Sequence, residues 1–261
     1  MPTAPEPPDA GRPAKRGGRM AEDAAVEEVP VWLEVNGAPA VTWMCTPDQL
    51  EELAVGWLAG EGYIDRVEEL VLRPCATDLG FWATVPEERV ETILRQGRRT
   101  VLASGCGAVS SWLLEDGGRA SPAPARALPP PLASLRELFK SLFARGRRYQ
   151  TTGGIHAAAL VEGEALIAHA EDIGRHNAVD KVVGAAMLAA RDIAGLGLLV
   201  TGRISAELAA KAARAGIAWV ATPSVPSTLA VEIAGKVGMT LVGRAVSGSP
   251  AVHRPPDRPA V

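Results

Sequence analysis

Residues 196–243 read LGLLVTGRISAELAAKAARAGIAWVATPSVPSTLAVEIAGKVGMTLVG, and this stretch decides the fold class. Three short apolar runs, typical of buried strands, alternate with two segments whose apolar residues recur at helical spacing. Repeated strand, loop and helix units predict an α/β layer in which the strands are at least partly parallel. Ligands of such sheets collect at the carboxyl ends of the strands, so the residues that follow each strand are the first candidates for a site.

The segments upstream extend the same pattern. Two strands are predicted around Glu162-Gly163, and they are followed by a helix over 174–193. A further helix with an apolar stripe is predicted over 132–150, after a Pro- and Ala-rich crossing at 117–131. We therefore assign residues 132–249 to one α/β domain.

Residues 26–116 are predicted to form a smaller N-terminal α+β part that includes a cysteine loop. Its opening, VPVWLEVNGAPAVTWMC, has alternating apolar positions around Asn36-Gly37, the strongest short signal for a tight β-hairpin. Thr46 is placed to cap the helix that follows, with Pro47 at the first helical position.

Composition bounds the class of protein. The 261 residues carry 27 Lys and Arg against 30 Asp and Glu, a net charge of −3, which excludes a strongly basic binder of duplex nucleic acid. With 47% apolar residues the chain can bury a core, whereas residues 1–25 and 250–261 are predicted to be disordered tails. The sequence has no run of roughly 18 to 20 apolar residues and no secretory signal. We expect a soluble cytoplasmic protein with no membrane or nucleic-acid partner.

Three cysteines, Cys45, Cys75 and Cys106, make an odd number without a CxxC pair, so neither a disulfide framework nor a four-cysteine zinc site is expected. Cys106 lies between Gly105 and Gly107, which would leave its thiolate open to a reaction partner. The alternative is a small buried side chain in a turn, and this core interpretation is favoured for Cys45 and Cys75.

The strand ends of the C-terminal domain carry hydroxyls, glycines and arginines. Thr201-Gly202-Arg203 follows one strand, Ser224 follows the next, and VGRAVSGS closes the last. Free backbone amides at helix starts, together with a bidentate arginine, suit a phosphate, and three such ends suggest one nucleotide-sized site. The competing interpretation is plain helix capping, since neither a P-loop nor a GxGxxG pattern is present.

The string EDIGRHNAVDK, residues 171–181, is dense in polar side chains. His176 and Asp180 lie four residues apart, as do Asn177 and Lys181, so each pair shares one helix face. Two interpretations remain open: a solvated helix start with ordinary ion pairs, or a buried polar network that supports a site.

Together these stretches resemble the FdhD family of sulfur carriers for formate dehydrogenases. The resemblance covers residues 28 to 245 and rests on six strings in the family's order, of which EDIGRHNAVDK is the most specific. These strings are EVPVWLEVNGAPAVTWMCTPDQLEELAVGWLAGEGYI, SGCG, TTGGIHAAAL with EDIGRHNAVDKVVG, TGRISAELAAKAARAGI and PSTLAVEIAGKVGMTLVG. The resemblance implies an α/β fold, with a cytidine-deaminase-like α/β domain and a smaller N-terminal α+β part, and a homodimer.

The resemblance also implies an activity. A cysteine desulfurase donates sulfur, the protein carries it as a persulfide, and the sulfur passes to the bis-molybdopterin guanine dinucleotide molybdenum cofactor of a formate dehydrogenase apoenzyme. Cys106 lies where the family's persulfide cysteine lies, while a second loop cysteine common in the family is replaced by Val109. The resemblance implies that the cofactor is bound by Arg203 and by a loop after the last strand. This loop consists of Arg244, Ala245, Val246, Ser247, Gly248 and Ser249. No metal ligands are implied.

Two other functions can be weighed against sulfur transfer. A chaperone that binds the cofactor for formate dehydrogenase without carrying sulfur would need the strand-end site but not Cys106. A zinc-dependent deaminase would need HxE followed by PCxxC; neither is present, since His156 is followed by Ala157 and Ala158. Sulfur on Cys106 separates the first two functions.

Overall fold

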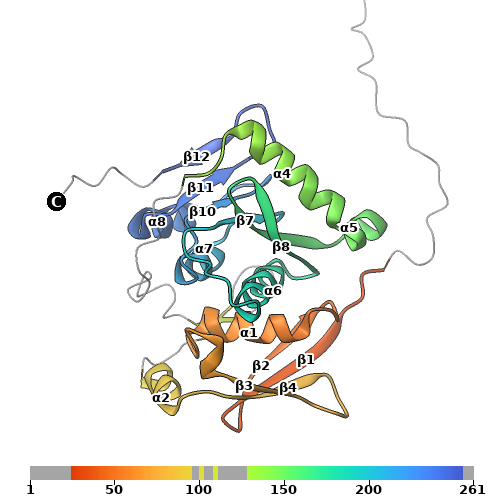
Figure 1. Ribbon diagram of the computed structural model, residues 1–261, viewed down its shortest axis with the longest axis vertical. Coiled ribbons are helices and arrows are strands. Elements are labelled where there is room, and N and C mark those ends of the chain that lie inside the picture. The colour runs from red at the N-terminus through yellow and green to blue at the C-terminus, as the bar shows by residue number, and fades with distance from the viewer. Residues whose placement is uncertain (1–24, 96–99, 103–107, 111–127, 255–261) are drawn as a thin grey trace, which may run out of the picture.

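The computed structural model describes residues 25–95, 100–102, 108–110 and 128–254, which form two lobes stacked on each other (Figure 1). The small lobe comprises residues 25–95 and the large lobe comprises residues 128–254. The predicted fold class, an α/β domain with a smaller N-terminal α+β part, is confirmed. Among the described residues, no helix is long and apolar enough to span a membrane.

A six-stranded mixed sheet forms the centre of the large lobe. Its strands, in spatial order, are β12 (Ala251–His253), β11 (Thr240–Gly243), β10 (Trp219–Ala221), β9 (Gly197–Val200), β7 (His156–Glu162) and β8 (Ala165–Asp172). β9, β10 and β11 are parallel, whereas β7, β8 and β12 run antiparallel to their neighbours. The expectation of partly parallel strands is confirmed. The prediction of a disordered tail from residue 250 is wrong at β12, which pairs with the edge strand β11.

Helices cover both faces of this sheet because successive strand residues point to opposite sides. α6 (Arg175–Leu188), α7 (Ala206–Arg214) and α8 (Thr228–Val237) pack on the face that carries side chains such as Leu160 and Leu198. α4 (Leu132–Arg145), followed by the short α5 (Arg147–Thr152), packs on the other face, against Leu199 and Trp219. The apolar stripe predicted for α4 is therefore its buried side.

A four-stranded mixed sheet and one long helix form the small lobe. The strands, in spatial order, are β2 (Ala38–Cys45), β1 (Val29–Val35), β4 (Gly80–Thr84) and β3 (Val71–Pro74), and the helix is α1 (Leu50–Glu61). The remaining elements are the 3-10 turn η1 (Val67–Glu69), α2 (Glu87–Arg95) and the pair β5 (Thr100–Leu102) and β6 (Ala108–Ser110). The predicted hairpin is confirmed, since Asn36 and Gly37 have φ of 47° and 80° between paired strands.

The start of α1 differs from the prediction. The helix begins at Leu50, after Gln49 in a left-handed conformation, and Thr46 does not cap it. Thr46 instead binds the large lobe: its hydroxyl accepts a hydrogen bond from Ile173 N at 3.1 Å, and its N–H donates to Asp172 at 3.1 Å. The Thr46 hydroxyl, which was predicted to cap the helix, is therefore used in a contact between the lobes.

The lobes meet where α1 crosses α6, and two glycines allow the helices to touch backbone to backbone. A Cβ at Gly56 would lie 1.8 Å from Asp180 O, and a Cβ at Gly184 would lie 1.9 Å from Glu52 O. Both separations are far below van der Waals contact, so neither position has room for a side chain. The contact between the lobes therefore requires glycine at both positions.

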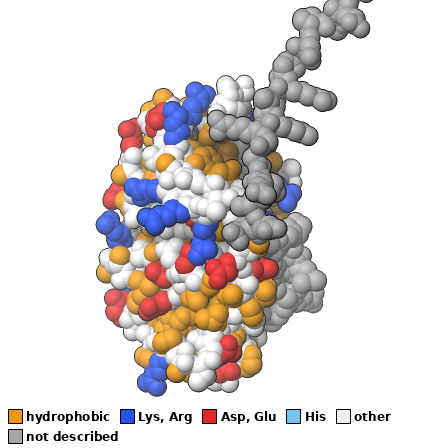
Figure 2. All heavy atoms as spheres, turned by 90° about the vertical axis from the view of Figure 1, so that its right-hand side faces the viewer, with side chains coloured by type: hydrophobic (Ala, Val, Ile, Leu, Met, Phe, Trp, Pro, Cys, Tyr) orange, Lys and Arg blue, Asp and Glu red, His pale blue; other side chains and the backbone are white. Residues whose placement is uncertain are grey.

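Apolar and basic side chains gather in different parts of one face of the molecule (Figure 2). Figure 2 shows hydrophobic side chains gathered low on one face, where the small lobe lies, and Lys and Arg side chains gathered above them. Met44, Val71 and Trp82 are among the exposed apolar residues of the small sheet. One of the arginines of α5 is paired across the lobes, because Arg148 Nε lies 3.1 Å from Asp48 Oδ2.

Candidate functional site

One edge of the large sheet collects the strand ends that the sequence singled out. β9, β10 and β11 end there, and the antiparallel pairing of β7 and β8 brings His156 opposite Asp172 at the same edge. We call this the carboxyl edge. From β8 to β11 it crosses five strands, which at ~4.8 Å per strand spacing amounts to about 19 Å. That length suits an elongated ligand.

Hydrogen bonds fasten the ends of β9 and β10 to each other. The Thr222 hydroxyl donates to Gly202 O at 2.6 Å and accepts from Ser224 N at 3.0 Å. Ile204 N donates to Val225 O at 3.2 Å, which ties the two following segments together. Arg203 lies between these anchors with its side chain exposed.

The turn after β11 joins the same group. Arg244 has a φ of 51°, its N–H donates to Ser224 O at 2.6 Å, and Ala245 N donates to Thr222 O at 2.9 Å. Ser247 closes the turn through its hydroxyl, which donates to Arg244 O at 2.8 Å. The side chains of Arg244 and Val246 are exposed, whereas Ala245 is buried. The three strand ends thus lie together as predicted, while ligand binding by Arg203 and residues 244–249 stays a prediction.

Helix capping accounts for two of the hydroxyls at this edge. Ser205 Oγ accepts a hydrogen bond from Leu208 N at 3.4 Å, and Ser227 Oγ accepts one from Ala230 N at 3.2 Å. The capping interpretation is therefore correct for Ser205 and Ser227. The side chains of Arg203 and Arg244 are exposed and form no hydrogen bond or ion pair with the residues that the structure describes.

The polar residues around the start of α6 form a buried network, so the solvated alternative is wrong. Lys181 is fully buried, and its Nζ lies 2.8 Å from Asp172 Oδ2 and 3.0 Å from both Thr46 O and Asp48 Oδ1. Asn177 Nδ2 donates to Asp172 Oδ1 at 3.0 Å. The partners come from other elements rather than from the next turn of the helix, and they bridge the two lobes.

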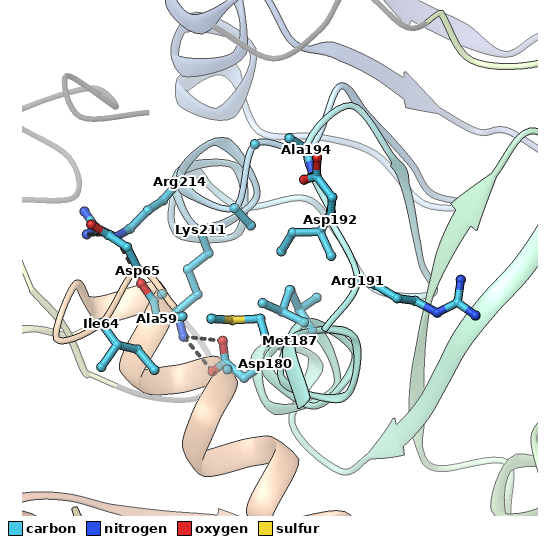
Figure 3. A pocket seen from close by; sticks show the side chains of 17 residues that line it. Ala59, Ile64, Asp65, Asp180, Met187, Arg191, Asp192, Ala194, Lys211 and Arg214 are labelled. Atoms are coloured by element: carbon cyan, nitrogen blue, oxygen red, sulfur yellow. Dashed lines mark hydrogen bonds and ion pairs between the residues drawn. The ribbon is translucent and has the colours of Figure 1, made fainter. Parts of the chain in front are cut away.

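A second buried pair joins α6 to α7. Lys211 Nζ contacts both carboxylate oxygens of Asp180, at 2.6 and 2.9 Å. The pair lines a cavity of about 240 Å³ among α1, α6 and α7 (Figure 3), into which Met187 points and from which Arg191 points away. The cavity is bounded by the C-terminal parts of these helices, so it is separate from the carboxyl edge.

His176, also on α6, contacts the start of α7. Its Nε2 lies 3.2 Å from Ser205 Oγ and 3.2 Å from Glu207 Oε2, and only 4% of the residue is exposed. A hydrolytic triad places the serine and the acid on opposite ring nitrogens of an accessible histidine. This serine, histidine and carboxylate therefore do not have the geometry of a hydrolase.

Glu207 makes the fold sensitive to pH. Burial raises the pKa of Glu207 to about 7, although nearby Lys211 opposes the shift. A carboxyl group whose pKa is higher in the folded than in the unfolded chain contributes its full stability at a pH below the unfolded pKa, which is 4.5 for Glu207. This contribution is lost as the pH rises toward the folded pKa of about 7.

We expect Glu207→Gln to remove this loss. Urea unfolding at pH 5 should give similar free energies for both proteins, and at pH 8 the variant should be more stable by about 1–3 kcal/mol. A difference that stays constant across this pH range would contradict the assignment.

The three cysteines lie in different surroundings. Cys106 falls outside the described residues. Cys45 is buried, as predicted, and burial raises its pKa to about 12, which makes it a poor nucleophile. The core interpretation of Cys75 is wrong: it lies partly exposed after β3, and hydrogen bonds from Thr77 lower the pKa of its thiol.

The sequence analysis missed several residues that organise the site. Thr46 and Asp48, from the connection between β2 and α1, meet a lysine more than 130 residues away in the chain. Thr222 fastens two strand ends through its hydroxyl. A threonine or aspartate in a loop carries no local signal for such contacts, because they form only when distant segments of the chain meet.

Comparisons with known proteins show the family to which the chain belongs. The model of the FdhD/NarQ family matches residues 26–260. A protein of Xanthomonas campestris pv. campestris named sulfur carrier protein FdhD is 34% identical over 249 residues, covering 93% of this chain and 89% of that protein. Its namesake in Bacillus subtilis is 35% identical over 239 residues, covering 91% and 90%.

A solved structure shares the fold along most of the chain. The crystal structure comes from Desulfotalea psychrophila and is described as that of a candidate formate dehydrogenase accessory protein. It superposes with a TM-score of 0.68 at 25% sequence identity, covering 88% of each chain. Because the family model matches residues 26–260 and the two relatives are 34% and 35% identical over about nine tenths of the chain, this chain belongs to the FdhD/NarQ family.

Proposed function

We propose that this protein is a sulfurtransferase that carries sulfur as a persulfide on Cys106. The Cys106 thiolate attacks the terminal sulfur of a persulfide on a cysteine desulfurase, forms a new S–S bond and releases the thiolate of the desulfurase. The step needs no outside oxidant, because the sulfur arrives already at the persulfide level. Membership in a family whose curated relatives are named sulfur carriers is the observation that carries the proposal.

The sulfur acceptor in this proposal is the bis-molybdopterin guanine dinucleotide cofactor, before this cofactor is inserted into a formate dehydrogenase apoenzyme. The carboxyl edge supports the choice because it is about 19 Å long and holds exposed Arg203 and Arg244 side chains, which suit phosphates. The turn 244–249 would cover one end of the ligand. The proposal places the protein in the cytoplasm as a homodimer.

Mass spectrometry of the intact protein tests the sulfur-carrying step. After incubation with a cysteine desulfurase and cysteine, the wild type should gain one sulfur atom and Cys106→Ala should gain none. Cys75→Ala is the matched control, because Cys75 is partly exposed and has a lowered pKa, yet its loss should leave the gain intact.

Either of two results would overturn sulfur transfer through Cys106. One is equal loading of Cys106→Ala and wild type. The other is no loading of any variant, which together with binding of GDP would favour a cofactor-binding chaperone that does not carry sulfur. Binding of GDP should survive in Cys106→Ala under both functions.

A further inference from the structure

His156 lies at the carboxyl edge and has no part in the function described so far. It is the first residue of β7, its Cα is paired with that of Asp172, and its ring is half-buried. Thr201, at the end of the neighbouring strand β9, is its hydrogen-bonding partner. The imidazole therefore stands beside the segment that carries Arg203.

The contacts of Thr201 favour one tautomer of His156. The Thr201 hydroxyl accepts a hydrogen bond from Ala157 N at 2.9 Å, and its oxygen lies 3.4 Å from His156 Nδ1. A hydroxyl that already accepts from an N–H can turn its own proton toward the imidazole. Nδ1 then acts as the acceptor, and Nε2 carries the N–H of the ring.

The surroundings keep this imidazole neutral. Burial lowers the pKa of His156 below its ordinary value of 6.5, and Arg175 on α6 lowers it further. Asp172 on β8 opposes these effects without reversing them. At pH 7 the ring is thus a hydrogen-bond donor rather than a cation.

A glycine allows the ring to approach the end of β9. A Cβ at Gly202 would lie 3.2 Å from His156 Cε1 and 3.0 Å from Arg175 Cδ. Both side chains therefore occupy the space that any other residue at 202 would need. His156 and Arg175 rest on the backbone immediately before Arg203, on the side of β7 rather than of β11.

We propose that His156 is a binding residue that donates a hydrogen bond from Nε2 to a phosphate oxygen of the ligand held along the carboxyl edge. The inference rests on the proposed function, which places a guanine-nucleotide-bearing cofactor there. It adds a contact on the β7 side of the edge, beyond the arginines and the turn 244–249. The neutral ring recognises an oxyanion by donating a hydrogen bond and not by carrying a positive charge.

Calorimetric titration with GDP provides the test. His156→Leu should weaken GDP binding by about tenfold or more, as expected when a hydrogen bond to a charged group is lost. His156→Gln, which can present an N–H in a similar place, should stay closer to wild type. His253→Leu is the matched control, because His253 is also half-buried but ends β12 opposite the start of β11, at the other edge of the sheet.

A second measurement does not depend on the folding of a variant. Long-range 1H–15N spectra of labelled wild-type protein should show the Nε2–H tautomer of His156 at pH 7, with a shift of Nε2 when GDP is added. The difference in affinity between wild type and His156→Leu should be unchanged from pH 7 to pH 8.5, because a neutral donor does not titrate in this range.

The outcomes separate the inference from the function on which it rests. If wild type binds GDP, and His156→Leu binds it equally well with no shift at Nε2, the role of His156 is wrong and the cofactor site survives. If wild type does not bind GDP, both proposals fall. A protonated ring, or a loss of affinity equal to that of His253→Leu, would also overturn the role of His156.

Discussion

Gly184→Ala is expected to lower the free energy of unfolding by roughly 4 kcal/mol or more, enough to threaten the fold. The added Cβ would lie 1.9 Å from Glu52 O on α1, which is a backbone atom and cannot rotate away. The helices must separate, and the buried contacts around their crossing are lost with them. Urea unfolding followed by circular dichroism measures the change.

Gly235→Ala provides the matched control for this prediction. Gly235 is also a helical glycine, in α8, and a Cβ there would meet nothing within 4 Å. Alanine has the higher helix propensity, so this variant should be more stable than wild type by about 0.5–1 kcal/mol. Similar effects of the two substitutions would show that helix propensity, and not the approach of α1, sets the cost at Gly184.

Lys181→Met is expected to destabilise the protein by about 3–5 kcal/mol. Lys181 and Asp172 are both fully buried, and their charged atoms lie 2.8 Å apart. Methionine fills most of the volume of lysine but leaves the Asp172 carboxylate without its cation. Asp48 would lose a partner as well, although it is more exposed and can be solvated.

A double variant separates the loss of the ion pair from the loss of packing. Asp172→Asn added to Lys181→Met removes the orphaned charge, so the double variant should be more stable than Lys181→Met alone by at least about 1 kcal/mol. Equal destabilisation would mean that packing, and not an unpaired carboxylate, dominates. Unfolding at pH 7 in urea serves for all three proteins.

Local patterns in the sequence were sufficient to predict most of the elements. Asn36-Gly37 specified a hairpin turn because both positions need positive φ, which these two residue types tolerate. Ser205 and Ser227 cap their helices through contacts three residues away. In each case the interaction lies within a few residues, so the chain itself carries the signal.

The predictions failed where distant segments compete for the same groups. Thr46 looked like a helix cap because the sequence shows Pro47 next to it, but its hydroxyl and N–H bind residues 172 and 173 instead. The spacing of four between Asn177 and Lys181 was real, yet both side chains turn toward Asp172. Short-range rules cannot anticipate which lobe a polar group will face.

The glycine crossing of α1 and α6 also bears on how the chain is made. α1 ends at Glu61 and α6 begins at Arg175, so 113 residues separate the two helices along the chain. At roughly 5–20 residues per second, a ribosome needs about 6 to 23 s to add them. Throughout this interval, the side of α1 that packs against α6 in the finished protein is not yet covered by α6. We expect nascent chains that stop before α6 to be captured by chaperones or cleaved by proteases, and chains that include it to resist both.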